Sequence, residues 1–487
     1  LQHVSESTKS EEAVWKKRYG LLDADVEIDP LLASEEDEES ADMEKIALGP
    51  ANKAGLFVSY HAYPYYPDFL DNDEILKKGA DNQGPNNYKA YLDLLVAHHA
   101  KYPVVISEFG VPSSRISAHW QPQGMTHGRH TEEEQGKINA RLLSNIYESG
   151  CAGAVLFEWM DEWFKKNWIV YNMEKPVDRK PFWYNFMDAE ENYGLIGNYP
   201  GSGGPSILID GKTDDWAKVP VYLSEGGMIL KLIADEGWLN LGIFSPSGDP
   251  AVNGFIVGIN IDDPTKGGHS LPFGMRFTSK AGMQFAIVFQ GEKAGLYVDR
   301  RFDLWTYQDK GFGAQLAADT GFDLVMPLAV TNPLRVGRNG IIYPEKTEVM
   351  GWLRRGTQDR NSPDFDSLSE WNSGPGFVEA RIPWGLLNIG DPSTRSVVLP
   401  QKGFKERDSQ ETTDGFRLTL MAYSGDAYFS RALFIRSLPG LKGGEIPLSP
   451  LFSWKTWENP TWHQVKKQSY TIYKDALAKI PDRPKSR

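Results

Sequence analysis

Three short hydrophobic runs in the first part of the chain become polar and aromatic where each run ends. They occupy residues 55–63, 103–110 and 152–159. A hydrophobic run of this length is typical of a parallel strand that is buried on both faces. The pattern therefore predicts three parallel strands that carry polar side chains at their carboxyl ends.

Two amphipathic segments separate the predicted strands. Apolar residues recur at three- and four-residue spacing near 86–100, which predicts a helix with one buried face. A second helix is predicted near 132–149, because Thr131 and Glu134 match a capping box and Gly150 is a common helix terminator. Alternating strands and helices predict a parallel α/β sheet, which binds its ligands at the carboxyl ends of the strands.

Helical periodicity stops after the Gly- and Pro-rich segment 199–205, which we interpret as a linker. Strand-length segments and turns then alternate, which predicts an antiparallel β-sandwich over 206–455. A helix is predicted over 463–480, in a closing region 456–487, and its apolar face is expected to dock on a domain surface. The predicted strands of the sandwich cover 221–224, 228–234, 238–244, 254–261, 284–290, 295–300, 377–382 and 416–423.

The composition is that of a soluble globular protein, since 40% of the 487 residues are hydrophobic and 24% are charged. This length predicts more than one domain. A net charge of −13 argues against a nucleic-acid partner, because phosphate binding depends on basic surfaces. No apolar run reaches the roughly 18 residues of a membrane-spanning helix. The first 50 residues are poorly patterned, and their acidic run 35–39 is interpreted as a solvated loop.

Glu108 is the strongest candidate for chemistry, because it ends an otherwise apolar strand. A carboxylate in this position is partly desolvated and faces the ligand side of the sheet. Retaining cleavage of a glycosidic bond needs one carboxylate to attack the anomeric carbon and one carboxylic acid to protonate the leaving oxygen. An isolated glutamate at a strand end more often forms a structural ion pair, so the interpretation depends on the neighbouring strand ends.

Those strand ends carry a resemblance to a known group of enzymes. The first strand runs into residues 59–67, Ser-Tyr-His-Ala-Tyr-Pro-Tyr-Tyr-Pro, and the third into residues 157–163, Phe-Glu-Trp-Met-Asp-Glu-Trp. With Ile-Ser-Glu-Phe-Gly at 106–110 between them, they resemble strands six, seven and eight of the retaining glycoside hydrolases of clan A, notably families 2 and 5. The resemblance covers roughly residues 50–200 and rests on three strand ends in the right order.

The resemblance implies a role for each matching residue. Glu108 would be the nucleophile, His61 and Tyr63 would orient it, and Trp159 would form the floor of the first sugar subsite. We expect the other polar and aromatic residues of the same strand ends to contact substrate as well. These residues are Tyr65, Glu158 and Trp163.

The acid/base residue of the clan is missing from this pattern. In the clan it follows an asparagine at the end of strand four, and no such Asn-Glu precedes residue 55. Segment 23–29 looks more like a remnant near strand five. A (β/α)8 barrel needs about 250 residues, so we expect a partial barrel over 1–200 without strands one to four. The sequence is then either a fragment or one half of a barrel that another chain completes.

Three carboxyl groups on the third strand end are the candidates to replace that acid. These groups are Glu158, Asp161 and Glu162. A structural role is more common for such groups, either in hydrogen bonds within the loop or in ion pairs with Lys165 and Lys166.

Histidines and acidic residues elsewhere are weaker candidates for metal ligands. His127 and His130 precede the second predicted helix and could line the mouth of the site. As metal ligands they have no third partner at a familiar spacing, so we interpret them as loop histidines. Asp262 and Asp263 fit either a structural calcium ion or a turn, and the turn is preferred. No phosphate-cradling glycine loop is present, and no organic cofactor is expected.

The start of the predicted sandwich also resembles a known family. Residues 207–216, which include an Asp-Gly turn and Trp216, are similar to the opening of family 9 carbohydrate-binding modules. In that family the turn and the indole are mainly structural, so Trp216 is expected in the core. The segment that begins at Glu379 resembles a late strand of the same modules.

The predicted fold is thus α/β plus all-β, with a partial (β/α)8 TIM barrel followed by an antiparallel, family 9 module-like sandwich. The predicted function is retaining glycoside hydrolysis of an oligo- or polysaccharide, completed by the missing barrel half or by a second copy of the chain. The alternative is a non-catalytic carbohydrate-binding protein that keeps the barrel remnant as a scaffold. A location outside the cytoplasm or at the cell surface is favoured, and the sugar and the linkage stay open.

Overall fold

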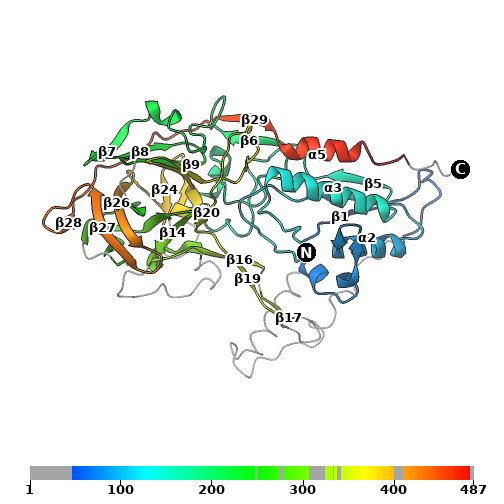
Figure 1. Cartoon of the computed structure of the whole chain (residues 1–487). Coiled ribbons are helices and arrows are strands. Elements are labelled where there is room, and N and C mark those ends of the chain that lie inside the picture. Colours follow the sequence, from blue (N-terminus) through cyan, green and yellow to red (C-terminus); the bar gives the residue numbers. More distant parts are fainter. Residues whose placement is uncertain are drawn as a thin grey trace, which may run out of the picture.

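The computed structural model describes residues 46–174, 176–246, 251–270, 273–274, 278–305, 324–332, 334–336, 342–399 and 410–482. The acidic run 35–39 and segment 23–29 lie outside these ranges. The described chain has two parts that lie side by side (Figure 1). The parallel part comprises residues 55–200, and the antiparallel part comprises residues 206–455.

Three parallel strands form the sheet of the parallel part. They are β1 (Val58–His61), β4 (Val104–Phe109) and β5 (Gly153–Leu156), in the order β1-β4-β5. The helices that alternate with them are α2 (Asn87–His98) and α3 (Glu132–Glu148). These elements lie where the sequence pattern predicted them.

Side chains at the helix starts explain where both helices begin. The side chain of Asn86 accepts a hydrogen bond from the backbone of Lys89 and caps α2. Thr131 and Glu134 form the expected capping box at α3, with both reciprocal hydrogen bonds present.

The two faces of the parallel sheet differ in burial. Val58, Ile106 and Leu142 share one hydrophobic cluster on the face that the helices cover. Successive side chains of a strand point to opposite faces. On the other face, Phe57 is 60% exposed and Val155 is 56% exposed. This second face therefore presents apolar side chains that the described residues leave open.

The end of the described chain returns to the parallel part. Strand β29 (Trp462–Lys466) pairs with β6 (Ile196–Pro200), and α5 (Gln468–Leu477) packs along α3 (Figure 1). The helix predicted over 463–480 is thus shorter, because residues 462–466 extend and pair with a strand. Strand β6 also takes in Tyr199 and Pro200 from the segment that we interpreted as a linker.

Two larger antiparallel sheets make up most of the antiparallel part, and a strand lies at each of the eight positions predicted there. The five-stranded sheet has the order β21-β22-β9-β8-β7, and the seven-stranded sheet has the order β15-β14-β13-β10-β26-β27, with β20 paired to β14. The strands of the first sheet are β7 (Val221–Glu225), β8 (Met228–Ala234), β9 (Trp238–Phe244), β21 (Trp371–Gly374) and β22 (Phe377–Pro383). Those of the second sheet are β10 (Gly254–Asn260), β13 (Phe285–Gln290), β14 (Lys293–Asp299), β15 (Leu324–Val325), β20 (Trp352–Leu353), β26 (Arg417–Asp426) and β27 (Arg431–Leu438).

Smaller elements lie in both parts of the chain. The remaining strands are β2 (Ala80–Asp81), β3 (Gly84–Pro85), β11 (Gly268–Ser270), β12 (Thr278–Met283), β16 (Leu328–Asn332), β17 (Arg335–Val336), β18 (Ile342–Tyr343), β19 (Lys346–Val349), β23 (Ile389–Asp391), β24 (Ser396–Val398), β25 (Gln410–Thr412) and β28 (Glu445–Ile446). Short 3-10 helices are η2 (Asp68–Asp71), η3 (Leu76–Lys78), η4 (Val177–Phe182), η5 (Asp215–Lys218), η6 (Arg300–Phe302) and η7 (Trp384–Leu387).

Trp216 lies in the core, as predicted, and connects the Asp-Gly turn at 210–211 to the five-stranded sheet through Glu379. Its side chain is fully buried, and its indole N–H donates to Oε2 of Glu379 at 2.8 Å. The other oxygen of Glu379 accepts from the backbone N–H groups of Asp210 and Gly211 at 2.7 and 2.6 Å. The Asp-Gly turn, the indole and the carboxylate therefore form one structural unit.

The two parts of the chain share a hydrophobic cluster, which is separate from the cluster under the helices of the parallel part. Ile116 and Val170 from the parallel part pack in the same cluster as Leu241 and Ile287 of the two antiparallel sheets. The buried side chain of Arg115 pairs with Glu370 across the boundary, at 2.6 Å. A partial barrel followed by a sandwich stays a prediction of fold class, because three parallel strands do not define a closed barrel.

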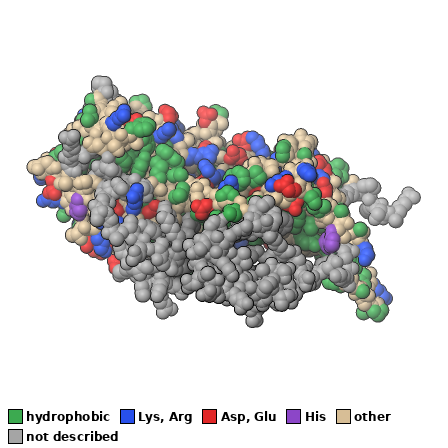
Figure 2. Space-filling model, turned by 90° about the horizontal axis from the view of Figure 1, so that it is seen from below, with side chains coloured by type: hydrophobic (Ala, Val, Ile, Leu, Met, Phe, Trp, Pro, Cys, Tyr) green, Lys and Arg blue, Asp and Glu red, His purple; other side chains and the backbone are tan. Residues whose placement is uncertain are grey.

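The described surface carries charges of both signs. Figure 2 shows Lys and Arg interspersed with Asp and Glu between hydrophobic side chains on the described portion of one face. In the described residues, no helix is long and apolar enough to cross a membrane.

Candidate active site

Glu108 lies at the carboxyl end of β4, the central strand of the parallel sheet. Its Cα pairs in register with that of His61 at the end of β1. Its side chain is 30% exposed, whereas the neighbouring Phe109 is buried under the helices. The strand geometry thus holds one carboxylate at the ligand end of the sheet.

Two side chains from β1 and the residues that follow it hold this carboxylate. Nδ1 of His61 lies 3.0 Å from Oε2 of Glu108, and the hydroxyl of Tyr63 donates to the same oxygen at 2.9 Å. Burial, followed by the charge of Glu108, raises the pKa of Tyr63 well above its usual value, so the phenol stays protonated. The structure therefore brings His61 and Tyr63 to Glu108, which is the arrangement that the resemblance implied.

A cavity of about 310 Å³ opens beside Glu108. Aromatic rings form most of its wall, and two carboxylates and one cation also line it. The lining residues are Tyr63, Tyr65, Tyr66, Glu108, His119, His127, Phe157, Lys165, Glu190 and Tyr193. A concave, aromatic site with a few converging polar groups is a common setting for a small polar ligand.

Nearly parallel rings build one wall of this cavity. Tyr65 stacks on His127 with ring centroids 4.5 Å apart and an interplanar angle of 5°. The hydroxyls of Tyr65 and Tyr193 share a hydrogen bond. Burial lowers the pKa of His127 well below its usual value, so this ring is uncharged at neutral pH. Tyr65 and His127 are each only 3% exposed, so this uncharged stack is a rigid support of the cavity, whereas Tyr66 in the same lining is 58% exposed.

Glu190 was not predicted, yet it lines the same cavity as Glu108. Asn167 donates from Nδ2 to Oε1 of Glu190 at 2.9 Å, and the backbone N–H of Glu190 donates to Asp188 at 2.8 Å. Burial is the largest cause that raises the pKa of Glu190. It stands in the loop sequence Asp-Ala-Glu-Glu-Asn at 188–192, where no strand or helix period marks a functional position.

Three other residues expected to contact substrate lie outside the lining of the cavity. Trp159 is 64% exposed and meets only the edge of Tyr470, at a centroid distance of 6.1 Å. Trp163 is partly buried against Tyr184. Glu158 is half-buried at the end of β5. A subsite floor at Trp159 therefore needs a ligand that extends beyond the cavity.

The carboxyl groups considered as replacement acids differ in their partners. Glu162 forms an ion pair with Lys165 at 3.0 Å, which is one of the two structural roles that we expected. Asp161 forms an ion pair with the buried Lys467 at 2.6 Å. Oε1 of Glu158 is buried and has no hydrogen-bond partner among the described residues. Burial raises the pKa of Glu158 to about 8. Only Glu158 of these three is thus protonated near neutral pH without a partner cation.

Of the weaker metal candidates, His130, Asp262 and Asp263 have partners within their own loops, and His127 lines the cavity. Thr126 accepts a hydrogen bond from His130 through its carbonyl oxygen at 2.9 Å. Asp263 accepts from the backbone N–H and the hydroxyl of Thr265, a turn contact, and Asp262 pairs with Lys266 at 2.8 Å. No group of three or more potential metal-binding side chains lies together in the residues that the structure describes.

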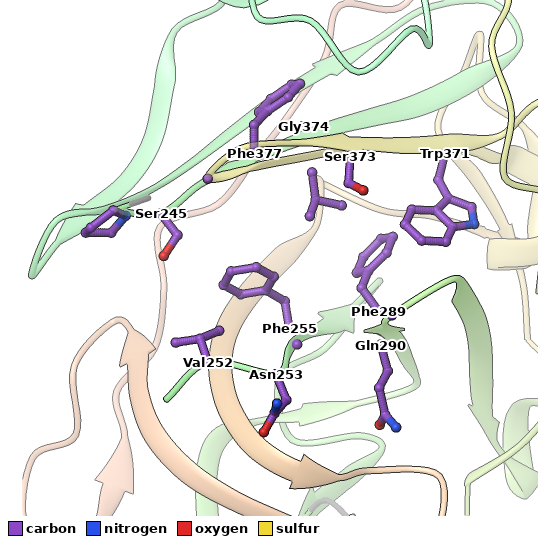
Figure 3. Close-up of a pocket in the computed structure, with 15 residues that line it drawn as sticks. Ser245, Val252, Asn253, Phe255, Phe289, Gln290, Trp371, Ser373, Gly374 and Phe377 are labelled. Atoms are coloured by element: carbon purple, nitrogen blue, oxygen red, sulfur yellow. The ribbon is translucent and has the colours of Figure 1, made fainter. Parts of the chain in front are cut away.

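A second cavity, of about 360 Å³, lies between the two antiparallel sheets. Figure 3 shows the rings of Phe255 and Phe289 directed into the same space, with Trp371 beside Phe289. The polar groups at its rim already have partners. Oε1 of Gln290 accepts from the backbone of Ala427 at 2.9 Å, and Oδ1 of Asn253 accepts from the backbone of Gly425 at 2.8 Å.

Comparison with known proteins gave weak matches to glycoside hydrolases. No protein-family model and no curated protein matched the chain. A β-glucuronidase of Bacteroides uniformis matches with a TM-score of 0.18 and 13% identity, over 50% of this chain and 24% of that one. A β-glucuronidase 2 of the same organism, covalently bound to cyclophellitol-6-carboxylate aziridine, matches with a TM-score of 0.18 and 12% identity, over 63% of this chain and 34% of that one. The match spans about a third or less of each enzyme, and TM-scores this low carry no argument about function.

Proposed function

We propose that this protein acts on a glycosidic bond with retention of configuration and that Glu108 is its nucleophile. The observation that carries the proposal is the contact of both His61 and Tyr63 with one oxygen of Glu108, beside an aromatic cavity. Two groups on one oxygen fix the orientation of the carboxylate, and the other oxygen is left to attack an anomeric carbon.

The substrate we propose is an oligo- or polysaccharide, and aromatic rings in the cavity would stack on its sugar faces. Tyr66, which is 58% exposed, is the ring of the lining most open to a ligand. The exposed Trp159 would serve a sugar unit outside the cavity. A second copy of the chain, or a chain that supplies the missing strands, would cover the open face of the parallel sheet.

Covalent labelling tests this proposal. The full chain is incubated with a panel of 2-deoxy-2-fluoroglycosyl fluorides, and intact mass and peptide mapping follow. We expect one adduct, on Glu108, and no adduct in Glu108→Gln, which keeps the size of the side chain. Absence of an adduct from every sugar, with a circular dichroism melt that shows folded protein, would reject a retaining glycosidase.

The second candidate is non-catalytic saccharide binding in the antiparallel part. The aromatic cavity between the sheets favours it, because Phe255 and Phe289 face the same space (Figure 3). Calorimetric titration of the unlabelled chain with oligosaccharides separates the two functions. Binding that is unchanged by Glu108→Gln and lost in Phe255→Ala would favour the binding protein.

A further inference from the structure

We propose that Glu190 is the general acid and base that works with Glu108 in the same cavity. The inference rests on the proposed function, since it assigns the second carboxyl group that a retaining glycosidase needs. It also gives the described chain both of its reacting groups, although the sequence resemblance placed the acid on a missing strand.

The placement of Glu190 comes from a loop that the rest of the fold holds in position. Glu190 and Glu108 line one cavity, with Tyr63 and Tyr193 in the wall beside them. Asn167 donates to Oε1 of Glu190 at 2.9 Å, which leaves Oε2 for proton transfer. The next residue, Glu191, is fully buried and pairs with Lys180, so the backbone on this side of Glu190 is anchored.

The surroundings of Glu190 raise its pKa above the usual value. Burial raises its pKa, the charge of Asp188 raises it further, and the hydrogen bond from Asn167 together with Lys165 and His119 lowers it. A negative charge on Glu190 contributes in turn to the raised pKa values of the Tyr63, Tyr65 and Tyr193 hydroxyls. An upward shift of the pKa is the direction that a general acid needs, because the group must give its proton to the leaving oxygen.

The two carboxyl groups complete a balanced double displacement. A carboxylate oxygen of Glu108 bonds to the anomeric carbon while the bond to the leaving oxygen breaks, and that oxygen takes the proton of Glu190 and leaves as an alcohol. Water then attacks the anomeric carbon and gives a proton to the Glu190 carboxylate. The ester bond to Glu108 breaks, and its electron pair returns to the carboxylate.

Glu158 is the rival for this role. It is also partly buried, and its pKa is raised to about 8. However, it is not among the residues that line the cavity with Glu108, and its Oε1 is closed off from solvent. A proton on Glu158 therefore has no described route to a leaving group held in the cavity.

The experiment compares leaving groups in Glu190→Gln, which keeps the size of the side chain and the oxygen that Asn167 contacts. The sugar that labels Glu108 is prepared as a 2,4-dinitrophenyl glycoside, whose leaving group needs no proton, and as an alkyl glycoside, whose leaving group does. We expect kcat/KM for the alkyl glycoside to fall by about 100-fold or more, and for the dinitrophenyl glycoside by less than about 10-fold. Azide should accelerate the variant on the dinitrophenyl glycoside and yield a glycosyl azide.

Control variants distinguish a specific role of Glu190 from a general effect of losing a carboxyl group. Glu148→Gln, an exposed position on α3, should match the wild type. Two results would overturn the assignment when wild-type Glu108 is still labelled. One is that Glu190→Gln changes kcat/KM equally for both glycosides, or changes it for neither. The other is that the selective loss of kcat/KM for the alkyl glycoside occurs in Glu158→Gln instead. If wild-type Glu108 is not labelled and the chain has no turnover, the proposed function fails, and the assignment fails with it.

Discussion

Carboxyl groups that lie within five residues of each other after β5 have very different environments. Asp161 is fully buried with Lys467, Glu162 is paired near the surface with Lys165, and Glu158 has an oxygen without a partner in the described residues. Desolvation disfavours the charged form of a carboxyl group unless a cation or hydrogen-bond donors offset it. Glu158 is therefore the residue of this group whose ionisation should affect stability most.

The pH dependence of stability tests the environment of Glu158. Burial raises its pKa from 4.5 to about 8, with a further contribution from the charge of Glu162. Between these values the unfolded chain loses the proton and the folded chain keeps it, so this contribution to stability is lost as pH rises. Because the side chain is only half-buried, we expect Glu158→Gln to be about 1 kcal/mol more stable than the wild type at about pH 8.5.

Urea unfolding monitored by circular dichroism measures this difference. The two proteins should have the same free energy of unfolding at about pH 4, where both side chains are neutral. A difference that is the same at both pH values would show that Glu158 does not titrate abnormally.

Among the residues of the candidate site, the sequence predicted those that a strand end holds in place. Glu108, His61 and Tyr63 stand at strand ends, and the parallel register brings those ends together. Glu190 could not be predicted in this way, because it enters the cavity from a loop. Its position depends on the hydrogen bond from Asn167 and on the pairing of Glu191 with Lys180 of η4, and no sequence period marks either contact.

Among the helices, the contact between α3 and α5 depends on one residue without a side chain. A Cβ atom on Gly136 would lie 2.8 Å from Cα of Ser469 and 2.9 Å from Cβ of Ile472. Glycine inside a helix normally destabilises it relative to alanine by up to about 1 kcal/mol. Here the close approach of two helices reverses that preference.

Gly136→Ala should therefore lower the free energy of unfolding by about 1–3 kcal/mol, although alanine is the better helix former. Amide hydrogen exchange should accelerate in α5, the helix that would have to move. Lys137→Ala, at an exposed neighbouring position, should change stability by less than about 0.5 kcal/mol. Stabilisation by Gly136→Ala would contradict the close packing of the two helices.

Elements with their own periodicity or caps were predictable, and elements defined by a distant partner were not. Helix α3 has a capping box and begins where predicted. Strand β29 was predicted as helix, because its apolar residues fit a helical face equally well. Only the pairing with β6, more than 260 residues earlier in the chain, selects the extended form.

Over the whole molecule, the shared hydrophobic cluster predicts that both parts unfold together. The cluster that contains Ile116 and Leu241 is continuous, and the buried pair of Arg115 and Glu370 crosses the same boundary. We expect a single calorimetric transition whose van't Hoff and calorimetric enthalpies agree. Two separate transitions would show that the parts are independent.

Arg115→Met tests whether the ion pair with Glu370 couples the unfolding of the two parts. It leaves Glu370 buried without its cation and should cost about 3–5 kcal/mol, because an unpaired buried charge is strongly unfavourable. The single transition should move to lower temperature without splitting. The double variant Arg115→Met, Glu370→Gln removes both charges and should recover part of the loss, which scanning calorimetry can measure.

The return of β29 and α5 has a consequence for how the protein can be divided. Residues 462–477 return to the parallel part, where β29 pairs with β6 and α5 packs on α3, so the antiparallel part lies between two segments of the chain that contact each other. A cut after residue 205 would separate Asp161 from Lys467 and α3 from α5. Expression boundaries and split-protein designs should therefore keep both flanks together, and they should keep the intervening residues as well, because Ile116 and Val170 pack in the core of the antiparallel part.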